Sequence, residues 1–322
     1  MDLIKNNLME NFAAFWFIFA NVYGAYTLPF TLFFLLLINA WLIIAVVLYI
    51  LCVWTMDKSV AEQGGRRLEC VRNFILWRHL KNYFPVSVSL NEPFKLDQKR
   101  NYLFCYYSQG TIGLGSTLSF GTTTGGFKQL FPYHKPYIFS YDVDSTPVYR
   151  DYLLSLGFCK TSVTSINWVL SSKGGNAGML VIEEPNEWLY KQSDHFFLPL
   201  LNKKGFVKLA IKSGSPLVPV IAFGDDVFCK FTIKKGSICK KIQQLTKALV
   251  NCGTISRSSL LPKKQPINII VGKPVDIKKV SNPSPTEVEF VHKLFILGIT
   301  ELFEKHKFQY LRDPDNTHLV LC

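Results

Sequence analysis

Three closely spaced glycines stand where a protein backbone could hold a negative charge. Gly110, Gly113 and Gly115 follow the apolar run Tyr102–Tyr107, which predicts a buried strand. Backbone N–H groups in a turn after a strand can bind an anion, or the oxyanion of a reaction intermediate. A tight turn from strand to helix explains the same glycines equally well. Their spacing matches neither the dinucleotide-binding fingerprint nor the phosphate loop of nucleoside triphosphatases.

The elements that would position this turn alternate between short apolar runs and helical periodicity, from about residue 101 onwards. The predicted strands besides Tyr102–Tyr107 are Met179–Ile182, Leu217–Phe223 and Ile267–Val271. The predicted helices are Pro147–Leu156, Val163–Ser171, Phe206–Lys212 and a last one from Pro285 to about His306. This alternation favours an α/β fold with a mostly parallel sheet covered by helices.

The N-terminal part has a different composition, because Asn11–Met56 contains no charged residue. As one helix it would be about 70 Å long at ~1.5 Å per residue, roughly twice a hydrocarbon core of ~30 Å. We therefore expect a membrane hairpin of two helices, with its turn either at Gly24–Pro29 or near Asn39–Trp41. The length of the apolar run argues against a cleaved signal peptide.

Cations and aromatic residues follow the apolar run and predict the orientation of the hairpin. The cations are Lys58, Arg66, Arg67, Arg72, Arg78 and Lys81. Positive charge beside a membrane exit marks the cytosolic side, so the α/β domain should face the cytosol. The expected organisation is a membrane hairpin at 1–56, a basic and aromatic interfacial segment at 57–100, and the α/β domain at 101–322.

Composition limits the classes of molecule that the chain is expected to bind. The net charge is +13, while hydrophobic residues make up 48% of the chain and aromatic residues 14%. No zinc-finger spacing, RNP-like aromatic run or basic recognition helix supports nucleic-acid binding. Anionic lipid headgroups, or the phosphates of a CoA thioester, are more suitable partners for a hydrophobic and basic protein. The eight cysteines include no C-x-x-C pair, so neither a metal site nor a disulfide framework is expected.

Several longer blocks make the chain similar to the type-2 diacylglycerol acyltransferase family, which includes monoacylglycerol and wax-alcohol acyltransferases. In chain order they are Gly64-Gly65-Arg66-Arg67, Tyr83-Phe84-Pro85, Arg150-Asp151-Tyr152-Leu153, Val271-Gly272-Lys273-Pro274 and Leu302-Phe303-Glu304-Lys305-His306-Lys307. The resemblance covers nearly the whole chain. It implies a glycerolipid-acyltransferase-like domain behind the hairpin, in the endoplasmic reticulum membrane, with the lipid droplet as a second location.

The resemblance also implies a reaction, namely transfer of a fatty acyl group from acyl-CoA to the hydroxyl of an acylglycerol or fatty alcohol. A general base would take the hydroxyl proton while backbone donors hold the oxyanion. The family's base lies in a His-Pro-His-Gly motif after the first strand, where this chain reads Tyr107-Ser108-Gln109-Gly110. Gln109 cannot accept a proton near neutral pH, and a Tyr107 phenol has a pKa of ~10.

Further site residues follow from the resemblance alone. Glu187 stands where the family keeps a glutamate, whereas Glu183-Glu184 replaces an expected Gly-Gly pair. The residues expected to contact acyl-CoA, which would be a co-substrate or ligand and not a bound cofactor, are Gly113, Gly115, Lys204 and Lys208.

No other histidine is an evident substitute for the missing base. The candidates are His79, His134, His195, His292 and His306, and none begins the His-x4-Asp pattern of related glycerolipid acyltransferases. His195 precedes an apolar stretch and is the one weighed as a replacement base.

The sequence therefore leaves two hypotheses for function, and with them the question of whether the chain is an enzyme. The first is an acyl-CoA-dependent O-acyltransferase of neutral-lipid synthesis whose activity is weak or lost. The second is a catalytically inactive paralogue that binds acyl lipid or regulates an active acyltransferase, as a homo- or hetero-oligomer with family members. A structural membrane protein without a ligand is disfavoured.

Overall fold

The computed structural model of the protein describes residues 6–21, 40–55, 57, 59–108, 113–144, 147–182, 195–225, 261 and 264–321. The helices are residues 6–21, α2 Ala40–Thr55, α3 Glu69–Arg72, α4 Ile75–Tyr83, α5 Leu114–Ser116, α6 Phe127–Leu130, α7 Pro147–Leu156, α8 Val163–Ser171, α9 Gly205–Ser213 and α11 Pro285–Tyr310. Two 3-10 turns at Val60–Glu62 and Tyr141–Asp144, and a π-helical turn at Thr117–Gly121, complete them.

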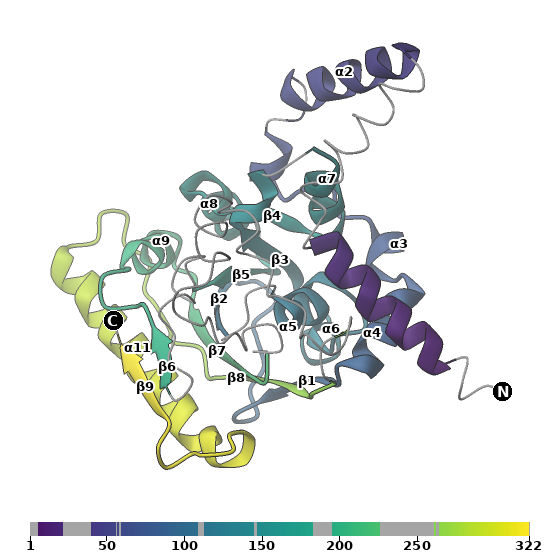
Figure 1. The fold of residues 1–322 in the computed structure, drawn as a ribbon. Coiled ribbons are helices and arrows are strands. Elements are labelled where there is room, and N and C mark those ends of the chain that lie inside the picture. The colour runs from purple at the N-terminus through teal and green to yellow at the C-terminus, as the bar shows by residue number, and fades with distance from the viewer. Residues whose placement is uncertain are drawn as a thin grey trace, which may run out of the picture.

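The strands form a seven-stranded sheet with a separate two-stranded sheet beside it (Figure 1). They are β1 Val86–Leu90, β2 Tyr102–Tyr107, β3 Lys135–Ser140, β4 Phe158–Lys160, β5 Asn176–Val181, β6 His195–Leu198, β7 Leu217–Phe223, β8 Ile267–Val271 and β9 His318–Leu321. The order in the large sheet is β1-β8-β7-β2-β5-β3-β4, and β6 pairs with β9.

Neighbouring strands are parallel throughout the large sheet, except that β7 and β8 are antiparallel. The mostly parallel sheet expected from the sequence is thereby confirmed. The reversal at β8 has a geometric consequence. The carboxyl ends of β2, β5 and β7 share one edge of the sheet with the amino ends of β8 and β1.

Most predicted elements agree closely with the structure. The predicted bounds of β2, β7, β8, α7 and α8 match it to the residue. Strand β5 begins at Asn176 rather than Met179, and α11 continues beyond His306 to Tyr310. Strand β1 lies within the segment 57–100, so that segment supplies an edge strand of the sheet.

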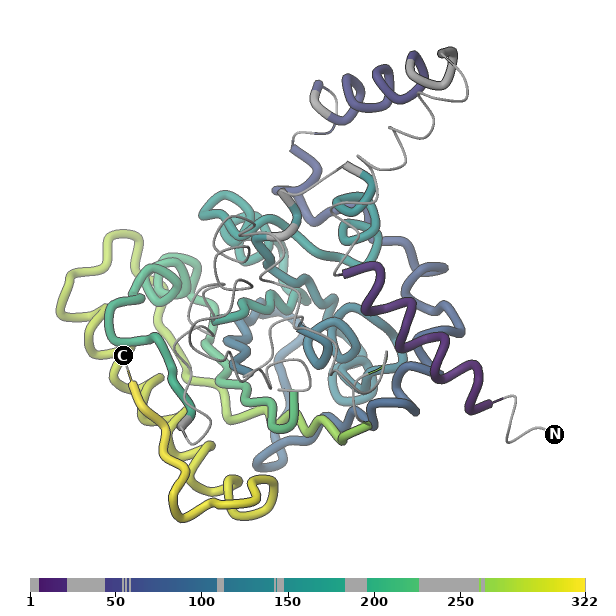
Figure 2. Tube along the Cα trace, in the orientation of Figure 1, coloured from purple at the N-terminus to yellow at the C-terminus, as the bar shows by residue number. Residues whose placement is uncertain are grey.

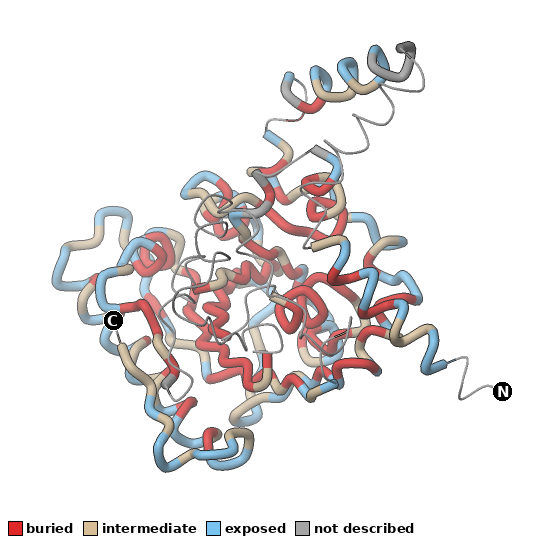
Figure 3. The backbone as a smooth tube through the Cα atoms, in the orientation of Figure 1, coloured by how far each residue is buried: buried red, intermediate tan, exposed pale blue. Residues whose placement is uncertain are grey.

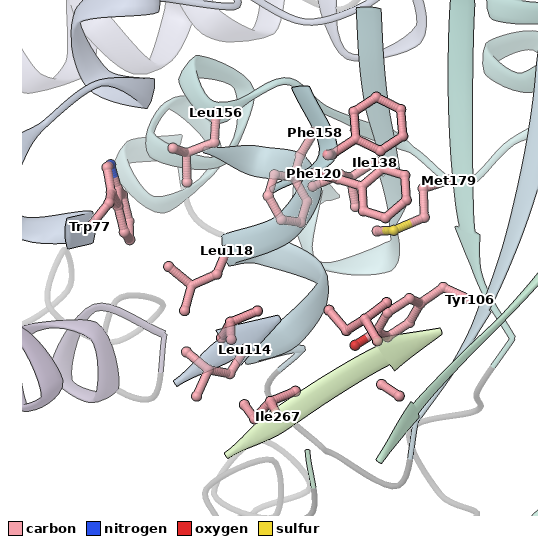
Figure 4. Close-up of a cluster of buried hydrophobic side chains, with 14 of the residues drawn as sticks. Trp77, Tyr106, Leu114, Leu118, Phe120, Ile138, Leu156, Phe158, Met179 and Ile267 are labelled. Atoms are coloured by element: carbon pink, nitrogen blue, oxygen red, sulfur yellow. The ribbon is translucent and has the colours of Figure 1, made fainter. Parts of the chain in front are cut away.

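Buried side chains form one cluster on each face of the sheet. Figure 3 marks much of the chain in the centre of the molecule as buried. Strand β2 divides between the two clusters, because alternate residues of a strand point to opposite faces. Phe104 and Tyr106 belong to one cluster, part of which Figure 4 draws, while Cys105 and Tyr107 belong to the other. A strand buried on both sides is typical of the centre of a parallel sheet.

The helix at residues 6–21 lies against the α/β domain rather than apart from it. The Phe17 ring meets Trp77 of α4 edge to face, with ring centroids 6.5 Å apart. Nζ of Lys264, just before β8, lies 2.9 Å from Oε2 of Glu10. The first and last described residues lie on opposite sides of the molecule in Figure 2. The contact between Lys264 and Glu10 therefore places the helix at 6–21 near the edge of the sheet where β8 and β1 begin.

Helix α2 projects away from the domain (Figure 1). Its outward side chains are apolar and exposed, among them Ile44, Val47, Leu48 and Leu51. Within the described ranges, every helix is too short or too polar to cross a bilayer. The membrane hairpin thus stays a prediction, and its possible turn at Gly24–Pro29 falls outside the described residues.

Two sequence blocks meet at the exit of α2. The side chain of Asp57 is buried and lies against the guanidinium of Arg66, with Nη1 of Arg150 3.5 Å from its Oδ2. Nη2 of Arg150 also donates to the Asp57 carbonyl oxygen at 2.8 Å. The Gly-Gly-Arg-Arg and Arg-Asp-Tyr-Leu blocks therefore fix the point at which the chain enters the domain.

Candidate active site

The glycine turn lies at the carboxyl end of β2, where α/β sheets place their ligands. Gly113 has a φ of +59°, a left-handed conformation that glycine adopts without strain. Its carbonyl oxygen accepts the Thr117 N–H at 2.9 Å, which starts the helical stretch of α5 and the π-helical turn. Gln109 and Gly110 lie outside the described residues.

A buried carboxylate holds the second half of the turn. Asp225, which follows β7 and is 2% exposed, accepts the Gly115 N–H on Oδ1 at 3.1 Å. Its Oδ2 accepts the Tyr106 hydroxyl at 3.0 Å. The Gly115 amide therefore does bind an anion, but that anion is a side chain of the same protein. Its predicted contact with acyl-CoA stays a prediction.

The same contact explains why glycine occupies position 115. A Cβ there would lie 2.5 Å from the Tyr106 hydroxyl oxygen and 3.0 Å from Oδ2 of Asp225. Figure 4 shows the Tyr106 hydroxyl pointing toward Leu114 and Ile267. Close approach of the turn to β2 and β7 thus requires a residue without a side chain.

Asp225→Ala should lower the stability of the whole chain by about 2–6 kcal/mol, because two buried donors lose their acceptor at about 1–3 kcal/mol each. Thermal unfolding of the purified full chain measures the effect. Asp276→Ala is the matched control, since that aspartate is 77% exposed and pairs only with a surface arginine. Equal destabilisation by the two variants would contradict the Asp225 clamp, that is, the stabilising role of its hydrogen bonds to the Gly115 N–H and the Tyr106 hydroxyl.

Tyr107, which the sequence predicts to stand in place of the first motif residue, makes structural contacts. Its side chain is fully buried and its hydroxyl donates to the Phe197 carbonyl oxygen at 2.6 Å. Its ring lies 6.2 Å from that of Phe196. A phenol that donates this hydrogen bond keeps its proton, so Tyr107 anchors β6 to the end of β2. His195, the first residue of β6, is therefore two residues from a contact with the motif.

A cavity of about 400 Å³ opens at the carboxyl ends of β4 and β5. Its lining includes the apolar residues Ile166, Ile182 and Phe206 and the cations Lys203 and Lys204. Lys204 also pairs with Glu289 of α11. Lys208 lies one turn further along α9 and is exposed. Of the two predicted CoA-binding lysines, the structure brings only Lys204 to a cavity.

Three imidazoles have structural partners. Nε2 of His134 lies 3.2 Å from the Asp97 carbonyl oxygen. Nε2 of His292 lies 2.9 Å from the Leu200 carbonyl oxygen. Nε2 of His306 lies 2.9 Å from Oδ1 of Asn91. Burial lowers the pKa of all three rings, which keeps them neutral at pH 7. His134 precedes β3 and Asn91 follows β1, so two of these rings belong to the sheet edge opposite the glycine turn.

Comparison with known proteins identifies the family to which this sequence belongs. The sequence model of the diacylglycerol acyltransferase family matches residues 33–322. The chain belongs to the diacylglycerol acyltransferase family. Diacylglycerol O-acyltransferase 2 of Dictyostelium discoideum is 34% identical over 76% of this chain and 77% of its own. Human 2-acylglycerol O-acyltransferase 3 is 35% identical over 79% of this chain and 78% of its own.

Among solved structures, the 1-acyl-sn-glycerophosphate acyltransferase PlsC of Thermotoga maritima aligns with 94% of this chain and 98% of its own, at 16% identity and a TM-score of 0.42. Within the described parts of this diacylglycerol acyltransferase family member, no group of three histidine, cysteine or acidic side chains is arranged to hold a metal ion. Glu187 and Glu183-Glu184 fall outside those parts.

Asp225 and Tyr106 were not predicted as site residues in this family member. The available signal was the position of Asp225, an acidic residue directly after a strand that is buried along its whole length. In a parallel sheet such a residue lies at the ligand-binding edge. Its partner could not be deduced, because nothing local shows that β7 lies beside β2.

Proposed function

We propose that this chain binds acyl-CoA and a lipid hydroxyl at the carboxyl edge of its sheet and forms the ester slowly or not at all. The observation that supports this most is the pair Tyr107 and Gln109, which replaces both motif histidines. The Tyr107 hydroxyl donates to the Phe197 carbonyl, and an amide at position 109 has no basic nitrogen.

The chemistry explains why one side chain has so large an effect. The acceptor hydroxyl attacks the thioester carbonyl, its proton passes to a base, and the CoA thiolate leaves and is protonated in turn. A positioned general base contributes about 10²–10⁴-fold to such a step. Without one, the scaffold retains binding and orientation but loses most of the rate.

The substrates and the location belong to the same proposal. An acylglycerol or fatty alcohol reaches the site from the endoplasmic reticulum membrane, with the lipid droplet as a second location and the α/β domain on the cytosolic side. Exposed apolar side chains on the helix at 6–21, such as Phe12 and Trp16, support membrane contact near the edge where β8 and β1 begin.

A second function has its own supporting observation. Strand β6 lies beside the end of β2 through the bond between Tyr107 and Phe197, and it begins at His195. Two residues along a strand cover about 6.8 Å, so the backbone of position 195 lies about that far from the Phe197 carbonyl. A working acyltransferase could therefore take its base from position 195.

Microsomes that carry the protein, supplied with labelled acyl-CoA and either acylglycerols or fatty alcohols, distinguish the two functions. We expect ester at or near the level of vector-only microsomes. Where ester exceeds that level, His195→Ala should leave it unchanged under the first proposal and lower it by about 10²-fold or more under the second. His134→Ala is the matched control, since that ring lies at the opposite edge.

The inactive paralogue has a separate readout. If the chain binds acyl-CoA without turnover, saturable binding should persist in the purified full chain while ester formation stays at background. Co-purification with an active acyltransferase, and a change in that enzyme's rate, would indicate a regulatory role. Absence of both binding and turnover would contradict the proposed function in either form.

A further inference from the structure

Four cations surround a hollow at the sheet edge opposite the glycine turn. Lys99 and Arg100 precede β2, Lys212 lies in the last turn of α9, and Lys279 follows β8. They line a cavity of about 460 Å³ beside the amino ends of β2, β5 and β7. Its described lining includes serine hydroxyls and asparagine amides but no acidic side chain. The hollow is therefore polar and positively charged.

Hydrogen bonds to backbone carbonyl oxygens fix the loops that carry these cations. Nδ2 of Asn101 donates to the carbonyl oxygens of Leu170 and Ser172 at 2.9 and 2.8 Å, which binds the loop before β2 to the end of α8. The Val280 N–H donates to the Ile211 carbonyl at 3.1 Å, which binds the loop after β8 to α9. The backbone of these walls is thus fixed by the fold, and exposed lysine side chains carry three of the four charges.

The positive charge of the four cations exceeds the negative charge that the described residues place near them. Arg100 pairs with Asp276 at 2.8 Å, whereas Lys99, Lys212 and Lys279 form no ion pair with any described residue. The carboxyl termini of α8 and α9 each present about half a negative charge to their last turn. One lysine offsets both helix ends, so about two positive charges remain without a partner.

We propose that this hollow binds a small phosphate-bearing anion at a site separate from the acyl-transfer edge. Its volume lies in the usual range of ligand sites, about 300–1,000 Å³. Ammonium and guanidinium groups that line one hollow are suited to bind phosphate through charge-assisted hydrogen bonds. Strand β2 spans about 20 Å, so a ligand here does not contact the glycine turn. This inference does not depend on whether the chain catalyses ester formation.

The test compares two pairs of lysine substitutions in the full chain purified in detergent. The double variant Lys212→Ala with Lys279→Ala removes two lining charges. The double variant Lys173→Ala with Lys278→Ala removes two exposed charges from neighbouring positions that do not line the hollow. Calorimetric titration with inorganic phosphate at constant ionic strength measures the affinity, and flotation with vesicles measures binding to lipid.

We expect phosphate to bind the parent chain saturably at one site. The lining variant should bind at least about tenfold more weakly, because it loses two charge-assisted hydrogen bonds to the anion, and the control variant should stay within about twofold. Preferential flotation with phosphatidate vesicles over phosphatidylcholine vesicles, lost only in the lining variant, would identify a lipid headgroup as the source of the phosphate. Without that preference, the source is a soluble phosphate.

Two results would overturn the site. One is the absence of saturable phosphate binding together with equal flotation on both kinds of vesicle. The other is equal weakening in the two double variants, which would mean that net charge alone attracts the anion. Neither result bears on ester formation, so the proposed function is tested separately.

Discussion

Replacing Gln109 by histidine is expected to raise ester formation by about 10²–10⁴-fold, the contribution of a positioned general base. The substitution returns an imidazole, with an ordinary pKa of ~6.5, to the place where the family motif has its base. Labelled acyl-CoA and an acylglycerol or fatty alcohol, supplied to microsomes that carry the variant, measure the gain.

Restoring more of the motif should add less than this first change. Tyr107→His removes the hydrogen bond to Phe197 and the ring contact with Phe196, so the triple change at 107–109 also loosens β6. Glu183→Gly with Glu184→Gly restores the other altered block. Gln129→His is the matched control, because it adds an imidazole to an exposed position of α6. A chain that binds acyl-CoA but gains nothing from any of these changes would contradict the missing-base explanation.

Arg72→Met is expected to destabilise the chain by about 3–6 kcal/mol, because it removes two buried hydrogen bonds from a charged donor at about 1.5–3 kcal/mol each. The Arg72 side chain is 2% exposed and donates to the carbonyl oxygens of Leu156, at the end of α7, and Phe120, in the π-helical turn. Burial lowers the pKa of Arg72 to about 10, so the guanidinium is still protonated at pH 7. Its removal leaves two buried carbonyl groups without that donor.

Thermal unfolding of the full chain should show a decrease in Tm of about 6–24 °C for this loss, at about 2–4 °C per kcal/mol for a domain of this size. Arg72→Lys should recover only part of it, because one ammonium does not span two carbonyls as a guanidinium does. Arg78→Met is the matched control on the exposed side of α4. A Tm for Arg72→Met within a degree or two of the control would refute the bridging role.

The sequence predicted the central strands because their apolar runs are sharply bounded. Strands β2, β7 and β8 are buried nearly throughout and end at polar or glycine residues. Five strands were not predicted: β6 and β9 contain only four residues each, and the other three were missed for local reasons. Strand β1 alternates valine with serine after a cluster of aromatic residues and cations, β3 has a proline at its second position, and β4 contains only three residues.

The site was predicted less fully than the fold. The glycine turn follows from local sequence, since it comes directly after a strand. The Asp225 clamp and the position of β6 beside Tyr107 do not, because each depends on contacts between residues about 90 to 120 positions apart. The long sequence separation also means that no pattern of hydrophobic periodicity could reveal them.

The parallel pairing of β1 with β8 also constrains when the domain can fold. Ser87 and Asn268 are partners although 181 positions separate them. At a synthesis rate of about 5–20 residues per second, β1 emerges roughly 10–40 s before its only neighbour in the sheet exists. Throughout that interval strand β1, which alternates valine with serine, has no partner. A nascent chain stopped before residue 267 would therefore present an open edge, which makes it a natural substrate for chaperones and for degradation.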